Sequence, residues 1–175
     1  SSGVTGTGPT YFTVETKDGM TRYYGNTSDS RIEAQGKTTV GTWALNRVED
    51  AAGNYYAITY HEDTAQGAFY PLTLAYTGND TTGLSPNVSV EFHYEDRPDT
   101  PVRFEGGAQV SEHPKRLANI QTFVGLDLVS DYRLTYELVG VDGSGANPDG
   151  GKLALLTRID RCDAGGPGAS CHRDL

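Results

Sequence analysis

The sequence has little of what marks a nucleic-acid or membrane protein. Its 14 Lys and Arg are outnumbered by 23 Asp and Glu, which gives a formal net charge of −9 at pH 7. That charge repels nucleic-acid phosphates and anionic membrane surfaces. No apolar run approaches the roughly 20 residues that span a bilayer, and no basic start precedes an apolar signal-peptide core. We therefore expect no nucleic-acid partner and no membrane insertion by this chain.

Cysteine is also scarce, with Cys162 and Cys171 both near the end of the chain. The segment between them is rich in glycine and flexible enough to bring the sulfurs together. A small disulfide loop in an oxidising compartment and a pair of free thiols are both open readings. A zinc site that added His172 would lack a fourth ligand and the usual Cys-x-x-Cys spacing, so we predict no metal site.

Glycine and tyrosine, by contrast, are abundant at 22 and 11 residues. With frequent Thr and Val, this composition favours strands joined by many turns. No segment has a sustained apolar stripe of helical period. We predict an all-β fold of consecutive antiparallel hairpins that form one or two twisted sheets. Residues 11–161 are the expected β domain, after a linker or artificial end at 1–10 and before a Gly-rich tail with two cysteines at 162–175.

The clearest hairpin is WALNRVEDAAGNYYAITYHED, residues 43–63. Both arms alternate in the way of strands, and Gly53 with Asn54 supplies the turn, because glycine adopts positive φ freely. We expect Trp43 and Leu45 to pack on the apolar side of the sheet. The acidic residues of the hairpin should lie near strand ends in water, with ordinary pKa values. They are Glu49, Asp50, Glu62 and Asp63.

Further alternating segments predict strands at 11–25, 69–96, 116–124, 129–139 and 152–161. Residues 102–110 read as one strand that is interrupted by a bulge or bend at two glycines.

An irregular repeat places an acid after tyrosine in TYHED, HYED and TYEL. The tyrosines of these units are Tyr60, Tyr94 and Tyr136. We expect each to close a strand of similar pattern and to be substantially buried against the neighbouring unit.

Eight stretches in order carry a family resemblance. They are FTVETKDGMTRYYG, SRIEA, WALNRVEDAAGNYY, YPLTLAYTGN, VEFHYEDRPD, KRLANI, YRLTYEL and LTRIDRC. Together they resemble the Rhs and YD-repeat family, and more narrowly the post-propeller region of insecticidal toxin-complex B components and SpvB-like virulence proteins. The resemblance covers residues from about 12 to 162.

In that family, long β-sheets spiral into a hollow shell around a toxic C-terminal polypeptide. The resemblance implies that this chain is a section of such a wall, whose partners are the remaining shell segments and the toxin cargo. It also implies a secreted or extracellular bacterial protein. The family's autoproteolytic aspartate motif and toxin domain are absent from this sequence, so the chain could not complete a closed shell.

Candidate catalytic residues do not form a recognisable set. His61 and Glu62 are adjacent on a predicted strand and point to opposite faces, so we expect His61 to be a surface residue. His93 should likewise lie on the less buried face. Paired carboxylates occur at strand ends, but a glycosidase needs two that face each other across a cleft. No G-x-S-x-G, P-loop or H-E-x-x-H motif is present. We predict no catalytic residues, no cofactor and no enzyme activity.

Two loops remain. VDGSGANPDGG, residues 141–151, offers oxygen ligands but lacks the EF-hand spacing, so a flexible connection is favoured over a calcium site. In EDRPDTP, residues 95–101, Arg97 lies between Asp96 and Asp99 and is expected to pin the corner by charge-assisted hydrogen bonds.

The leading hypothesis is therefore a non-catalytic structural segment of an Rhs or toxin-complex β-shell that encapsulates a toxic polypeptide for secretion or delivery. The alternative is an adhesin-like carbohydrate- or protein-binding β module that uses exposed tyrosines.

Overall fold

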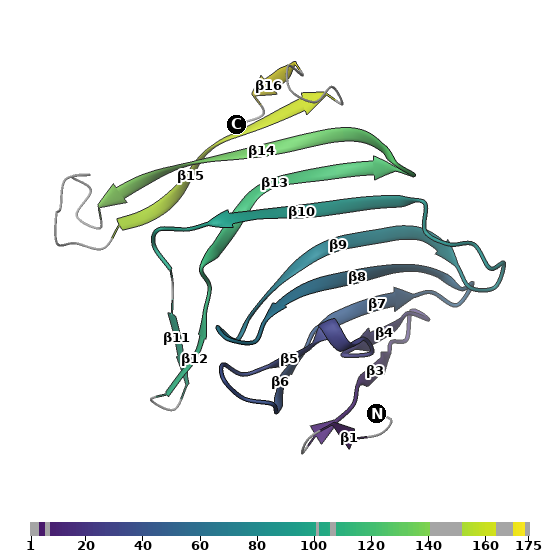
Figure 1. The fold of residues 1–175 in the computed structure, drawn as a ribbon. Coiled ribbons are helices and arrows are strands. Elements are labelled where there is room, and N and C mark those ends of the chain that lie inside the picture. Colours follow the sequence, from purple (N-terminus) through teal and green to yellow (C-terminus); the bar gives the residue numbers. More distant parts are fainter. Residues whose placement is uncertain are drawn as a thin grey trace. The chain divides into compact units, whose positions relative to one another are not determined.

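The computed structural model describes residues 4–5, 8–100, 102–105, 108–140, 152–163 and 170–173 (Figure 1). Its strands pair antiparallel, mostly between neighbours in sequence, and a short 3-10 turn, η1 (Ser28–Ser30), lies between them. The predicted all-β class is confirmed. In these described ranges, no helix has the length and apolar character needed to cross a membrane.

The chain forms two compact units. The first contains Ser1–Val90 and Val102–Glu112, and the second contains Glu91–Pro101 and His113–Leu175. The predicted boundaries at 1–10, 11–161 and 162–175 remain predictions.

The main sheet of the first unit has the strand order β9-β8-β7-β4-β3. Its central hairpin, β8–β9, pairs from Asn54 opposite Asn79 to Asp63 opposite Ala68, with two register shifts. Figure 1 shows these two long strands side by side. The strands of this sheet are β3 (Phe12–Glu15), β4 (Thr21–Tyr24), β7 (Leu45–Glu49), β8 (Asn54–Asp63) and β9 (Ala68–Asn79).

Three short strand pairs complete the first unit. They are β1 (Val4–Thr5) with β2 (Gly8–Pro9), β5 (Arg31–Glu33) with β6 (Val40–Trp43), and β11 (Val102–Glu105) with β12 (Ala108–Glu112). Glu105 lies opposite Ala108, so residues 102–110 belong to a hairpin. The expected single bent strand is therefore wrong, because β11 and β12 are two strands that pair antiparallel with each other.

The second unit has the strand order β16-β15-β14-β13-β10. The β14–β15 pairing runs from Ser130 opposite Asp163 to Gly140 opposite Lys152, with one register shift. The strands are β10 (Val88–Asp96), which begins in the first unit, β13 (Lys115–Val124), β14 (Asp127–Gly140), β15 (Lys152–Asp163) and β16 (Cys171–Arg173). β16 lies in the predicted C-terminal tail, and the strand expected at 152–161 is confirmed.

The first arm of the 43–63 hairpin breaks at Ala44. The N–H of Ala44 donates to the Ser30 carbonyl at 2.8 Å, and its carbonyl accepts from the Gly25 N–H at 2.9 Å. Trp43 therefore belongs to β6 and Leu45 to β7. In β7 the buried side chains are Asn46 and Val48, on the face opposite to Leu45. The prediction that Trp43 and Leu45 pack on the same apolar side is wrong.

Trp43 instead packs near the start of the chain. Its ring stacks edge-to-face on Phe12 with centroids 5.1 Å apart, and its indole N–H donates to the Pro9 carbonyl at 3.0 Å. A Cβ atom on Gly25, which has φ of +71°, would collide with the indole ring. Trp43 therefore fastens the β5–β6 pair to the N-terminal strands.

Candidate functional site

The predicted turn of the 43–63 hairpin is present. Gly53 has φ of +83°, and Asn54 is the first residue of β8. The Asp50 carboxylate accepts hydrogen bonds from the Asn54 amide at 2.8 Å and from the N–H groups of Asn54 and Ala52 at 2.8 and 2.9 Å. These bonds, led by those from Asn54, lower the pKa of Asp50. Asp50 therefore shapes the turn as an ionised hydrogen-bond acceptor.

Tyr60 and Tyr136 make the same contact in the two units. The Tyr60 hydroxyl donates to the Leu45 carbonyl on β7, and the Tyr136 hydroxyl donates to the Leu117 carbonyl on β13, each at 2.7 Å. Burial raises the pKa of both phenols, which are half-buried. Tyr94 on β10 is half-buried as well.

The expectation that each of the three tyrosines closes a strand is wrong for Tyr136. β14 continues four residues beyond Tyr136, to Gly140. The repeated contact across to the preceding strand is thus the feature that Tyr60 and Tyr136 share.

We expect Tyr60→Phe and Tyr136→Phe each to lower the free energy of unfolding by about 1 kcal/mol, because each leaves a half-buried carbonyl without its hydroxyl donor. Urea unfolding followed by circular dichroism measures the loss. Tyr76→Phe is the matched control, since Tyr76 is 37% exposed, and it should leave stability unchanged. Equal stability of all three variants and the wild type would contradict a role for the hydroxyls.

The corner that follows β10 is held by Arg97. Its guanidinium binds Asp99 through Nε and Nη2, both at 2.9 Å, and the Asp99 carboxylate also accepts the Ala154 N–H at 2.7 Å. The hydrogen bond from Arg97, followed by that from Ala154, lowers the pKa of Asp99 to about 2. The prediction that Arg97 pins this corner is confirmed for Asp99, whereas Asp96 pairs with Lys115 at 2.5 Å.

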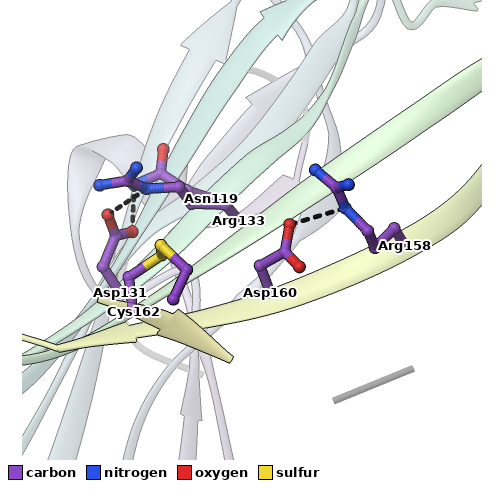
Figure 2. Close-up of a disulfide and its surroundings, with 7 residues drawn as sticks. Asn119, Asp131, Arg133, Arg158, Asp160 and Cys162 are labelled. Carbon is purple, nitrogen blue, oxygen red and sulfur yellow. Dashed lines mark hydrogen bonds and ion pairs between the residues drawn. A yellow bond between two sulfur atoms is a disulfide. The ribbon is translucent and has the colours of Figure 1, made fainter. Parts of the chain in front are cut away.

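The disulfide region of the second unit contains a buried acid that sequence reasoning missed (Figure 2). Asp131, which is 5% exposed, lies opposite Cys162 in the β14–β15 register. Its carboxylate accepts from Asn119 Nδ2 at 3.0 Å and from Arg133 Nε at 2.8 Å. Burial raises the pKa of Asp131, but these bonds and the charge of Arg133 outweigh it and lower the pKa. Asp131 is therefore an ionised structural residue.

Cys162 and Cys171 are bonded to each other and are register partners on β15 and β16. Cys162 is fully buried, whereas Cys171 is exposed. The choice between disulfide and free thiols, which the sequence left open, is thus resolved. Neither sulfur is a thiolate that could ligate zinc while the bond is intact.

We expect the double variant Cys162→Ser, Cys171→Ser to lose about 2 kcal/mol of unfolding free energy, because the bond closes a short loop in the unfolded chain. Thermal unfolding of the variant and of the wild type measures this loss. Dithiothreitol should destabilise the wild type by a similar amount and leave the variant unchanged. A variant as stable as the oxidised wild type would contradict the prediction.

The prediction that the histidines and the acids of the 43–63 hairpin face water is only partly confirmed. His61 and His93 are exposed, and His93 lies 3.7 Å from the Glu91 carboxylate. Glu62, however, is half-buried, and its Oε1 accepts the Glu33 N–H at 2.9 Å. Burial and a hydrogen bond with the Glu33 side chain raise the pKa of Glu62 to about 7. The expectation of an ordinary pKa is wrong for Glu62.

An open groove of about 390 Å³ lies in the first unit. A β-bulge shapes it, because Tyr55 pairs with Gly78 and Ala57 with Ala75, which leaves Tyr56 opposite two residues of β9. One of these, Thr77, has φ of +75°, a strained value for a β-branched residue. The lining residues are Met20, Val48, Asp50, Asn54, Tyr55, Tyr56, Tyr76, Thr77 and Gly78.

Tyr55 is fixed at one side of this groove. The Arg47 guanidinium lies 3.7 Å from the ring centroid, and a Cβ atom on Gly78 would come within 2.6 Å of the ring. Glycine at position 78 therefore lets the ring approach the main chain of β9.

The candidate calcium loop at 141–151 lies outside the described residues. Within them, no group of three or more His, Cys, Asp or Glu side chains has an arrangement that could hold a metal ion.

Comparison with known families identifies the fold. The model of the SpvB family, described as Salmonella virulence plasmid 65kDa B protein, matches residues 3–91. The chain belongs to the SpvB family. No curated protein sequence matches it.

Three solved structures share the fold. The N-terminal domain of effector protein SpvB from Salmonella typhimurium strain LT2 has a TM-score of 0.66 and 14% identity, over 87% of this chain and 61% of that one. The crystal structure of TcdB2-TccC3-Cdc42 has a TM-score of 0.67 and 13% identity. The crystal structure of TcdB2-TccC3 without the hypervariable C-terminal region has a TM-score of 0.68 and 13% identity. Both alignments cover 93% of this chain and 10% of the toxin-complex chain.

This SpvB-family chain is therefore a β domain that shares its fold with toxin-complex chains, and the SpvB-like resemblance indicated by its sequence motifs is confirmed. It spans less than two thirds of each of the three solved chains.

Proposed function

We propose that the chain is a non-catalytic structural segment of a β-walled toxin assembly that encloses a toxic polypeptide. The observation that carries this proposal is the likeness to the toxin-complex chains, which covers 93% of this chain and so includes both compact units. The partners would be the remaining wall segments of the parent protein and its cargo.

The polar contacts of the described residues support a structural role. Asp50 holds a turn, Asp99 holds a corner and Asp131 joins neighbouring strands. Each carboxylate accepts hydrogen bonds from groups of the chain itself, which suits a scaffold better than proton transfer to a substrate. We extend the proposal to the absence of enzyme activity.

Secretion from a bacterium is part of the same proposal. A disulfide between Cys162 and Cys171 forms and persists in an oxidising compartment, and the family description refers to a virulence plasmid of Salmonella.

The proposed wall function is tested by measuring whether the assembly protects its toxic polypeptide from protease. The complete gene product of the source organism should keep its toxic polypeptide intact under protease until denaturant opens the assembly. The same polypeptide expressed alone is the control and should be cut rapidly. Equal cleavage rates in both preparations would overturn the proposal, as would a complete gene that encodes little beyond these residues.

A second candidate, a carbohydrate-binding module, is favoured by the tyrosine-lined groove. Tyr55, Tyr56 and Tyr76 offer aromatic surface, and the neighbouring Asn54 offers a polar group for sugar hydroxyls. The strain at Thr77 is of the kind found at ligand sites.

Titration against a panel of glycans separates the two candidates. Binding in the micromolar range that is lost in Tyr76→Ala would support the module. Leu72→Ala, which changes an exposed residue of the same strand outside the groove, is the control and should bind like the wild type. If no glycan binds, the carbohydrate-binding candidate is rejected, and the structural segment of a toxin assembly remains as the proposed function.

A further inference from the structure

The β5–β6 pair is attached to β8 through side-chain carboxylates. β7 pairs with β8 over a short stretch, from Glu49 opposite Tyr55 to Arg47 opposite Ala57. Farther along β8, the Tyr60 N–H donates to Asp29 Oδ2 at 2.7 Å. In the opposite direction, the N–H of Glu33 on β5 donates to Glu62 Oε1 at 2.9 Å.

Weaker contacts continue this junction past the end of β8. The Gly36 N–H donates to the Thr64 carbonyl at 3.3 Å, and the Gln35 amide donates to Gln66 Oε1 at 3.4 Å. Apart from the long Gly36–Thr64 main-chain bond, the junction therefore depends on individual side chains, and the protonation state of each carboxyl matters for it.

Glu62 is surrounded mainly by acids. Its Oε1 accepts the main-chain N–H of Glu33 at 2.9 Å, and the side chains of Glu33 and of Asp29 in η1 both act to raise its pKa. Across the β8–β9 ladder its partner is Phe69, which carries no charge.

The other charged groups of the packed elements are directed elsewhere or are also acidic. Arg31 on β5 donates to the Gly25 carbonyl at 3.0 Å, and the Asp63 carboxylate accepts the Gln66 N–H at 3.2 Å. His61 lies on the opposite face of β8 and is exposed. Glu112 of β12 reaches this region through its main-chain N–H, which donates to the Gln66 carbonyl at 2.8 Å.

We propose that Glu33 and Glu62 form a proton-operated clasp, which holds the β5–β6 pair against β8 under mildly acidic conditions and loosens as the pH rises past neutrality. One proton shared by two carboxyl groups gives an O–H···O hydrogen bond between them. When that proton leaves, two like charges stand side by side in a half-buried site, with Asp29 close by. The clasp does not depend on whether the domain belongs to a toxin wall.

The direction of the pH effect follows from proton linkage. Burial, the interaction with the Glu33 side chain and the nearby negative charges outweigh the hydrogen bond from the Glu33 main-chain N–H, and they raise the pKa of Glu62 from 4.5 to about 7 in the folded chain. Between these values the folded chain binds more protons than the unfolded chain, so stability falls as the pH rises. The stabilising contribution of Glu62 is therefore fully present below about pH 4.5 and is lost as the pH passes through about 7.

Trp43 provides a direct readout, because it is the one tryptophan of the chain and ends β6. Its indole contacts Phe12 and the Pro9 carbonyl, so release of the β5–β6 pair would change its surroundings. We expect Trp43 fluorescence of the folded wild type to change with a midpoint at about pH 7. The melting temperature should fall as the pH rises from about 4.5 to about 7 and should level off above that.

Glu62→Gln is the decisive variant. The amide keeps an oxygen for the Glu33 N–H and supplies a fixed N–H donor to the Glu33 carboxylate, so it imitates the protonated clasp. The fluorescence change should disappear, and the variant should melt several degrees above the wild type at pH 8.5. Asp63→Asn and His61→Gln are the controls, because they remove neighbouring titratable groups, and both should keep the wild-type transition.

Identical pH profiles for the wild type and Glu62→Gln would overturn the clasp, and so would loss of the transition in His61→Gln. If Glu62→Gln does not fold, carbon NMR of the glutamate carboxyls in the wild-type chain decides the matter. A midpoint for Glu62 near 7 would support the clasp, whereas a midpoint near the ordinary value of 4.5 would reject it.

Discussion

Asp99→Ala is expected to lower the free energy of unfolding of the second unit by about 3 kcal/mol, as loss of one partner from a buried ion pair commonly does. The Asp99 side chain is 2% exposed and binds Arg97 bidentately. It also accepts the main-chain N–H of Ala154, which is distant in sequence. The alanine variant removes the charge partner of Arg97 and the acceptor of that N–H together.

Asp96→Ala is the matched control for this prediction. Asp96 belongs to the same corner and pairs with Lys115, but its side chain is 85% exposed. Exposed ion pairs contribute roughly 0–1 kcal/mol, so this variant should unfold almost like the wild type. Urea unfolding of both variants measures the difference, and equal losses would mean that burial at Asp99 does not matter.

The pH dependence of the same residue gives a further check. The pKa of Asp99 falls from the ordinary value of 3.8 to about 2 in the folded chain, so the unfolded chain binds more protons between these values. The contribution of Asp99 to stability is therefore present above about pH 4 and lost as the pH falls through about 2. Asp99→Ala should lack this part of the acid dependence.

Features encoded by neighbours in sequence were predictable. Arg97 and Asp99 are two residues apart, so their ion pair could be expected from the sequence. Gly53 lies between two alternating arms, so the turn could be expected as well. Strand alternation likewise indicated β13, β14 and β15. In each case the pattern and the interaction occupy the same short window.

Features that depend on distant segments were not predictable. The break at Ala44 is made by main-chain hydrogen bonds that Ala44 donates to Ser30 and accepts from Gly25, and no pattern within residues 43–63 reveals them. Glu62 has the sequence pattern of an exposed strand-end acid, but β5, which is distant in sequence, lies beside it. The alternation of β7 was visible, but alternation alone does not say which of its two faces the fold buries.

Gly53→Val is expected to cost about 4 kcal/mol, the largest loss among these predictions, because strain and steric overlap act at the same atom. At φ of +83° a β-branched side chain crowds the main chain. The new Cβ would also collide with the Thr81 hydroxyl and lie 3.1 Å from the Thr81 nitrogen. The neighbouring turn cannot easily withdraw, since the Asp80 N–H donates to the Gly53 carbonyl at 2.9 Å.

Gly83→Val separates the two effects. Gly83 has φ of +72°, close to that of Gly53, but a Cβ atom there meets nothing within 4 Å. It should therefore show the strain alone, about 1 to 2 kcal/mol. The excess loss in Gly53→Val then measures how tightly the turn of the 43–63 hairpin packs on the turn that follows β9. Equal losses at both glycines in urea unfolding would mean that Thr81 moves aside freely, and a tolerant Gly53 would mean that the turn at this end of the hairpin does not limit its stability.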